Sequence, residues 1–244
     1  MSSFGLCLAI ESATPMASVA LLNEGAVLAQ EQGPPGQHHS ENLLPMVDRA
    51  LLAADVALSE VDCFAISIGP GAFTSLRIGL ATLKGLAFGR DQPVAAVSTL
   101  QALALSAKRA GRIEGSGPII VPMLDARRGE VYAAAYEEDT LSQAEAVEVL
   151  PSSVYSAAAL VRALPKGGLF VGEGAAVVAS SDVALDTDRF SVESGQPSVP
   201  HAVAVAILGR ACIEAGRGVL ADSLVPRYVR RAQAEAQRTS RAVE

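Results

Sequence analysis

The sequence predicts an α/β fold built from two similar halves. Short apolar runs with the length and composition of β-strands alternate with longer segments whose apolar residues have helical spacing. In the first half, three strands are followed by a helix, a strand, a helix, a strand and a helix (βββαβαβα). The glycine-rich stretch from Gly111 to Gly117 is typical of a linker, and a weaker copy of the same order follows it. A chain of 244 residues is long enough to bury cores of this size.

The spacing of apolar residues gives the elements of the first half. We expect strands at residues 6–10, 17–22, 26–31, 63–68 and 94–97, and helices at residues 40–54, from Gly71 as far as Ala87, and at residues 98–109. Ser40 or Asn42 is the candidate N-cap of the first helix. Asn42 is favoured, because it places Pro45 in the first turn, where a helix tolerates proline.

The second half repeats this pattern less clearly. We expect strands at residues 119–124, 131–137, 146–150 and 169–171, and helices at residues 153–164 and 202–215. The tail from Arg227 onwards is rich in Ala, Gln and Arg and is helical at best. Mixed sheets in this order, duplicated about a cleft, are typical of the ribonuclease-H-like, actin-like (ASKHA) architecture. We therefore expect an N-terminal actin-like subdomain at residues 1–110, and a C-terminal one with its tail at residues 111–244.

The composition argues against several classes of protein. A net charge of −7, no tryptophan and 4% aromatic residues disfavour direct binding of a nucleic acid, whose backbone is negative and whose bases stack on aromatic rings. Three cysteines far apart in the sequence support neither a disulfide framework nor a zinc site. The N-terminus has no basic stretch before its apolar run, and no apolar run is long enough to span a membrane. We therefore expect a cytoplasmic protein without a membrane partner.

Two helices of the first half carry more apolar surface than one core contact needs. Arg77 and Lys84 are the charged residues of the helix after Gly71, and they either pair with carboxylates of a partner or form a solvated stripe. A helix that is apolar nearly all round is buried on more than one side, so we predict that both helices bind a partner protein. The predicted contact residues are His39, Leu43, Leu44, Met46, Val47, Leu51, Phe73, Leu76, Arg77, Leu80, Leu83 and Lys84.

The turn Gly69-Pro70-Gly71, between a strand and a helix N-terminus, has two interpretations. It presents free backbone N–H groups to an anion such as a nucleotide phosphate, or it simply permits a tight turn. Ser12 and Thr14 lie where actin-like ATPases have their first phosphate loop, and Glu11 takes the place of a magnesium-linked carboxylate. The alternative for these residues is hydrogen bonding at a strand end. The candidate phosphate-binding residues are Ser12, Thr14, Gly69 and Gly71.

Five segments together resemble the bacterial TsaB (YeaZ) family over roughly residues 4–230. Ala72 and Ser75 stand where Ser and Gly are usual in that family, and Ser75 adds bulk to the second helix. The segments are IESAT at 10–14 with SVAL at 18–21, HSENLLP at 39–45, the Gly-Pro-Gly turn with FT at 73–74 and LRIGL at 76–80, DARRGEVY at 125–132, and PRYVR at 226–230.

The resemblance implies a scaffold or dimerization subunit that is not itself an enzyme. Proteins of that family support the catalytic paralogue TsaD, which transfers threonylcarbamoyl from an adenylate to the adenosine beside the anticodon of tRNA, and TsaE, an ATPase, joins them. The resemblance also implies homodimers through the same helices, ATP or ADP near the subunit boundary, and contact with tRNA only through the complex. The paralogue holds a metal with a His-x-x-x-His pair. The matching positions here are Thr99 and Leu103, so we expect no metal site.

The alternative functions are a stand-alone actin-like ATPase and a peptidase-like hydrolase. A peptidase needs a nucleophile–base pair or a metal, for which the sequence gives no clear candidate. Two charged segments each have two possible roles. DARRGE at 125–130 predicts a turn with Gly129 at positive φ, whose charges either order the cleft between the halves or contact a partner. The basic tail either touches tRNA or is a solvated end; its arginines are Arg227, Arg230, Arg231, Arg238 and Arg241.

Overall fold

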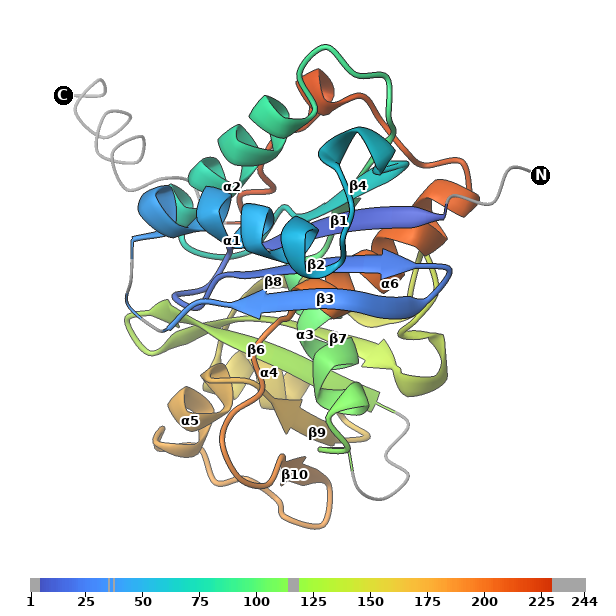
Figure 1. Cartoon of the computed structure of the whole chain (residues 1–244). Helices are drawn as coiled ribbons and strands as arrows, with labels where there is room; N and C mark the ends of the chain where they lie inside the picture. Colours follow the sequence, from blue (N-terminus) through green and yellow to red (C-terminus); the bar gives the residue numbers. More distant parts are fainter. Residues whose placement is uncertain (1–4, 35, 37, 114–118, 230–244) are drawn as a thin grey trace, which may run out of the picture.

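The computed structural model describes residues 5–34, 36, 38–113 and 119–229. These residues form two five-stranded mixed sheets, one above the other in Figure 1. The first sheet has the strand order β3-β2-β1-β4-β5. The elements of the first half are β1 (Leu6–Glu11), β2 (Ser18–Asn23), β3 (Ala26–Gln32), α1 (His39–Ala53), β4 (Cys63–Ser67), α2 (Phe73–Leu86), β5 (Val94–Val97) and α3 (Thr99–Arg109).

The second sheet has the order β10-β9-β6-β7-β8, which is the same arrangement built from the second half. In each sheet the first strand of the half is central, antiparallel to one neighbour and parallel to the other. The duplicated order predicted from the sequence is therefore confirmed. The elements of the second half are β6 (Ile119–Arg127), β7 (Glu130–Glu137), β8 (Glu148–Ser156), α4 (Ala157–Ala163), β9 (Gly168–Val171), α5 (Gly174–Ala179), β10 (Phe190–Val192) and α6 (Ala202–Glu214).

Three apolar cores alternate with the two sheets. Helices α1 and α2 cover the outer face of the first sheet, and α4 and α5 cover the outer face of the second. The central core lies between the sheets, where α3 and α6 pack against each other. Helix α6 belongs to the second half but packs on the first sheet, and α3 belongs to the first half but packs on the second. The two halves therefore bury their facing surfaces through exchanged helices.

The inner face of the first sheet is built from small side chains. Cys7, Ala9 and Ala65 point to this side of the sheet, whereas the larger Leu8 and other side chains of the opposite face point towards α1 and α2. A Cβ atom on Gly209 of α6 would overlap the Cβ atom of Ala65. Small residues on both elements thus allow α6 to approach the sheet closely.

Several element boundaries differ from the sequence prediction. Helix α1 begins at His39 without a side-chain cap, so Asn42 is not its N-cap and Pro45 lies inside the helix. Because proline has no N–H, the Glu41 carbonyl has no helical hydrogen-bond donor. Both residues face solvent, which reduces the cost of the proline because water can bind this carbonyl.

In the second half, the expected helix at 153–164 begins only after Ser156, which caps α4 by accepting a hydrogen bond from the Ala159 N–H (3.3 Å). Val154 and Tyr155 instead extend strand β8 along β7. Both α5 and β10 were missed by the prediction. Most of the predicted linker and nearly all of the predicted tail lie outside the described residues. Within the described ranges, no helix is long and apolar enough to cross a membrane.

Two glycines of α2 provide a test of how closely this helix packs. A Cβ on Gly79 would collide with the Ser12 hydroxyl and lie 2.9 Å from the Ser12 Cβ, whereas a Cβ on Gly85 would meet nothing within 4 Å. We predict that Gly79→Ala destabilises the protein by about 1–3 kcal/mol. Gly85→Ala, the control, should be neutral or stabilise it by up to about 1 kcal/mol. Chemical denaturation measures both, and equal effects would contradict the close contact.

Candidate functional site

Glu11, the last residue of β1, is fully buried and holds the loop between β1 and β2. Its Oε1 accepts hydrogen bonds from the Ala13 N–H (2.7 Å) and the Ser67 hydroxyl (3.2 Å), and the Thr14 hydroxyl lies 3.3 Å from its Oε2. Burial raises the pKa of Glu11 from 4.5 to about 8, and these hydrogen bonds, which favour the charged form, offset only part of that effect. At neutral pH this side chain is therefore largely a neutral acid.

The same loop positions the start of both helices α1 and α2. The Ala13 carbonyl accepts the N–H of Ala72, the N-cap residue of α2, at 2.8 Å. The Thr14 carbonyl lies 2.8 Å from Nε2 of His39, the first residue of α1, so this nitrogen carries the proton and donates. His39 is thus an internal anchor of α1 and is 7% exposed, which differs from its predicted role as a partner contact.

The Gly-Pro-Gly turn is shaped by close approaches within the chain. Gly69 has φ +118°, and a Cβ there would lie 2.7 Å from the Arg227 carbonyl oxygen. A Cβ on Gly71 would lie 2.6 Å from the Ala13 Cβ. The Gly69 N–H donates to the Thr99 hydroxyl (3.1 Å). These contacts support the interpretation that the glycines permit a tight turn.

The side chains proposed to hold a phosphate are already engaged or turned away. The Thr14 hydroxyl contacts Glu11, and the Ser12 hydroxyl faces Gly79 of α2, where it is buried without a hydrogen-bond partner among the described residues. The backbone N–H of Ala13, between these two residues, is also bonded to Glu11. The Ala13 N–H and the Thr14 hydroxyl thus already have a partner inside the chain.

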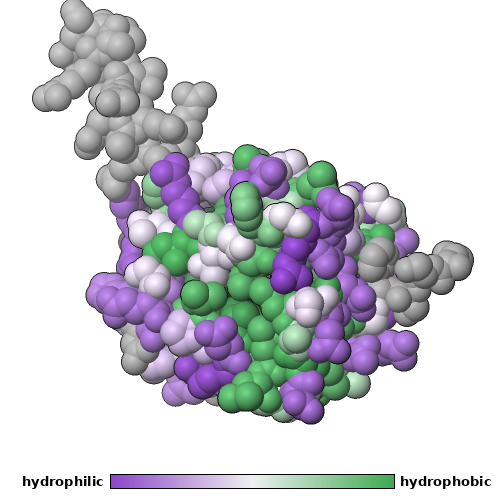
Figure 2. Space-filling view, turned by 45° about the horizontal axis from the view of Figure 1, so that its top comes forward, coloured by the Kyte–Doolittle hydropathy of each residue, from purple (hydrophilic) through white to green (hydrophobic). Residues whose placement is uncertain are grey.

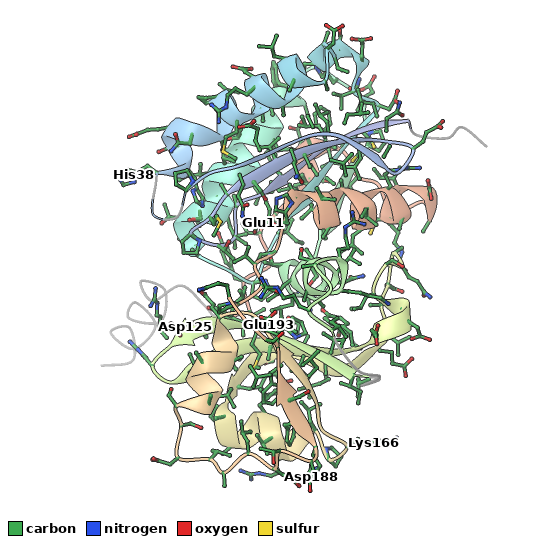
Figure 3. All side chains as sticks on the ribbon, turned by 60° about the horizontal axis from the view of Figure 1, so that its bottom comes forward. Glu11, His38, Asp125, Lys166, Asp188 and Glu193 are labelled. Atoms are coloured by element: carbon green, nitrogen blue, oxygen red, sulfur yellow. The ribbon has the colours of Figure 1, made fainter. Side chains whose placement is uncertain are left out.

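A cavity of about 400 Å³ lies between the two halves, beside this loop. The β6–β7 hairpin forms its opposite wall and repeats the contact made by Glu11, because Oδ1 of Asp125 accepts the Arg127 N–H (2.7 Å). Figure 3 shows Glu11 in the first half and Asp125 in the second. Gly129 has positive φ as predicted, and Arg127 and Arg128 also do, which costs a non-glycine residue energy. The C-terminal residues Arg227 and Tyr228 complete the lining.

Seven of the twelve predicted partner contacts are buried inside the chain, which corrects the sequence prediction. Their side chains point to the first sheet, to the turn before α2 or, for His39, to the β1–β2 loop, and Leu224 of the C-terminal segment packs into the same core. Leu44, Phe73 and Arg77 are exposed, and Leu51 and Lys84 are half-buried. The buried residues are His39, Leu43, Met46, Val47, Leu76, Leu80 and Leu83.

An exposed apolar surface nevertheless remains on α1 and α2, at positions that differ from most of those predicted. Leu44 is 50%, Leu52 82% and Phe88 85% exposed, and the small residues Ala81 and Gly85 of α2 are exposed as well. We call these five residues the outer face. Figure 2, which brings this side of the molecule forward, shows hydrophobic residues gathered over a continuous area. Phe88 was missed because it lies two residues beyond the end of α2, outside the predicted helix.

Thr99 and Leu103, which the resemblance implied as the counterparts of a metal-binding pair, have structural roles. Thr99 accepts the Gly69 N–H, and Leu103 is buried against Gly172, where a Cβ would lie 2.7 Å from its Cδ2. Leucine has no metal-binding atom. Among the described residues, no group of three His, Cys, Asp or Glu side chains could hold a metal ion.

Glu11→Gln tests the buried neutral carboxyl. Glutamine keeps the shape and its Oε1 still accepts from Ala13. Folding raises the pKa of Glu11 from 4.5 to about 8. Between these pH values the folded protein therefore binds more protons than the unfolded chain. The stabilisation that the Glu11 proton contributes is therefore complete below pH 4.5 and is lost above pH 8. Between these values the free energy of unfolding decreases by about 1.4 kcal/mol per pH unit. We predict that Glu11→Gln removes this slope.

Denaturation of both proteins across this pH range measures the effect. Glu31→Gln, which changes an exposed ion pair with Arg49 (2.9 Å), is the control and should retain the slope. Parallel stability curves for the wild type and Glu11→Gln would contradict the assignment.

Comparisons with known proteins now place the chain in a family. The family model described as "TsaD: tRNA N6-adenosine threonylcarbamoyltransferase" matches residues 34–236. "YeaZ from Pseudomonas aeruginosa" superimposes with a TM-score of 0.75 and 30% identity, covering 92% of this chain and 99% of that one. A second solved structure, an uncharacterized protein "with similarity to peptidase YEAZ from Pseudomonas aeruginosa", has 31% identity over 93% of this chain and 100% of that chain, also with a TM-score of 0.75.

Curated relatives agree over part of their length. The tRNA threonylcarbamoyladenosine biosynthesis protein TsaB of Escherichia coli is 39% identical over 132 residues, 54% of this chain and 55% of that protein. The Bacillus subtilis TsaB is 35% identical over 53% of this chain and 54% of that protein. The match thus spans about half the length of these relatives. The resemblance and the duplicated actin-like fold expected from the sequence are confirmed, and the chain belongs to the TsaD family, in which it is a TsaB/YeaZ protein.

Proposed function

We propose that this chain is a non-catalytic subunit in the synthesis of threonylcarbamoyladenosine on tRNA, and that it binds a TsaD-type catalytic partner through its outer face. The printed names of its curated relatives place those proteins in that biosynthesis. The observation that carries the proposal is the exposed apolar surface on α1 and α2. Burying one large apolar side chain contributes about 1.5–3 kcal/mol, so Leu44, Leu52 and Phe88 offer a substantial driving force for association.

The shape of the outer face fits a helical partner. Ala81 and Gly85 lie one turn apart on α2 and have small side chains, so another helix can approach this position closely. The larger Leu52 and Phe88 lie near the C-terminal ends of α1 and α2. A paralogue with a similar pair of helices would match this surface, and so would a second copy of the chain, which accounts for the homodimer implied by the resemblance.

The non-catalytic role is supported by the contacts of the residues that match metal-linked positions of related enzymes. Glu11 is a buried acid with its hydrogen bonds made inside the chain, and Thr99 and Leu103 pack against glycine turns. The net charge of −7 disfavours direct binding of tRNA, so we propose that tRNA meets this subunit only within the complex. A TsaE-type ATPase, ATP or ADP at the subunit boundary and a cytoplasmic location belong to the same proposal.

Ala81→Arg tests the docking surface. The position is exposed on α2, so the folded chain can accept arginine, but a long charged side chain would block close approach of a helix. We predict that binding to the TsaD-type protein of the same organism weakens by about tenfold or more, measured by isothermal titration calorimetry. Ala158→Arg, an exposed position on α4, is the matched control and should bind normally.

Thermal unfolding checks that both variants are folded, because exposed substitutions change stability by only about 0.5 kcal/mol. Normal binding by a folded Ala81→Arg protein would contradict the assignment of the interface. Hydrolysis of ATP or of an unfolded protein by the rigorously purified chain alone would favour the ATPase or peptidase alternative.

A further inference from the structure

The C-terminal residues 219–229, which we call the strap, run along one flank of α2 (Figure 1). The strap begins beside β5, where Val94 and Val219 exchange two backbone hydrogen bonds (2.8 and 3.0 Å). Further along, the Lys84 ammonium donates to the Asp222 carbonyl (3.1 Å). Leu224 is 4% exposed and belongs to the core under α1 and α2. We call residues 219–224 of the strap the anchor, because these contacts hold them firmly.

The far end of the strap is held by a second group of contacts at the N-terminus of α2. The Arg227 N–H donates to the Ile68 carbonyl (2.7 Å). The Tyr228 ring stacks on the Phe73 ring, with centroids 5.0 Å apart and an interplanar angle of 27°. Arg77 lies 3.9 Å from the Phe73 centroid and donates through Nε to the Tyr228 hydroxyl (2.9 Å). We call these contacts of Arg227 and Tyr228 the clasp.

The clasp differs from the anchor in how easily it can open. Tyr228 is 40% and Phe73 37% exposed, and Val225, between the anchor and the clasp, is 69% exposed. Contacts that are few and half exposed to water break in local openings that leave the rest of the fold intact. Release from Val225 onwards would leave Leu224 in the core and α2 on its sheet.

The strap occupies polar and aromatic groups that a partner on α2 could otherwise use. Phe73, Arg77 and Lys84 were predicted from the sequence as partner contacts, and all three now contact the strap. They lie along one flank of α2, beside the exposed Ala81 of the outer face. Aromatic and arginine side chains are also the residue types that contribute most to protein interfaces.

We propose that the strap is an autoinhibitory contact: the clasp keeps Phe73 and Arg77 on the chain's own C-terminal segment, and a partner that docks on the outer face competes with Tyr228 for them. The competition rests on the proposed function, whereas the clasp itself does not. An open fraction below one lowers the apparent affinity for the partner by that fraction. Variants that open the clasp should therefore bind the partner more tightly.

Amide hydrogen exchange tests the clasp in the isolated protein. In Tyr228→Ala, we predict that the Arg227 amide, which is bonded to Ile68, exchanges about tenfold faster, while the Leu224 amide, bonded to Ala221, is unchanged. Tyr228→Phe loses the hydroxyl but keeps the stacked ring and should have a smaller effect. Tyr155→Phe removes a comparable exposed hydrogen bond, to the Pro151 carbonyl (2.8 Å), and is the control. Unchanged exchange at Arg227 in Tyr228→Ala would overturn the clasp.

Binding of the same variants to the TsaD-type protein tests the competition. We predict a rise in affinity of up to about tenfold for Tyr228→Ala and none for Tyr155→Phe. Equal or weaker binding of Tyr228→Ala, with faster exchange at Arg227, would overturn autoinhibition while leaving the clasp in place. If Ala81→Arg binds normally, or if the wild type does not bind at all, the proposed docking surface is wrong. The exchange experiment on the isolated protein tests the clasp independently of that outcome.

Discussion

The arrangement of the first half depends on how the Glu11 carboxyl holds the β1–β2 loop. Glu11 is buried at the end of β1 and accepts the Ala13 N–H at 2.7 Å. The loop that it fixes then offers two carbonyls, one to the N-cap residue of α2 and one to His39 at the start of α1. Both helices therefore begin at neighbouring carbonyls of one loop, and the buried acid that holds this loop helps to position the outer face.

This use of the loop bears on the choice between binding a phosphate and supporting a surface. The Ala13 N–H and the Thr14 hydroxyl already contact Glu11, and the hairpin opposite uses Asp125 to accept the Arg127 N–H in the same way. A buried polar group is satisfied once it is hydrogen-bonded, and these donors find their partners within the chain. The loops at the junction thus stabilise the chain itself, while the exposed apolar residues on α1 and α2 carry the proposed interaction.

The repeated strand–helix order was predictable because long apolar runs identify central strands and buried helices. The short β10 and α5 were not, since three and six residues carry too little pattern. Apolar width indicated that α1 and α2 are special, but it could not separate Leu80, which packs on the sheet, from Leu52, which faces solvent. The role of Tyr228 depends on a contact 155 residues away in sequence from Phe73, and no local pattern reports such a contact.

The titration of Glu11 tests the central claim most directly. Carbon-13 NMR of protein labelled at the glutamate side-chain carboxyls follows each group with pH, and the spectrum of Glu11→Gln identifies the Glu11 resonance. The account predicts that this resonance titrates near pH 8, well above the ordinary value of 4.5. A midpoint near 4.5 would show a solvated, charged carboxylate at neutral pH and would contradict a loop held by a buried neutral acid.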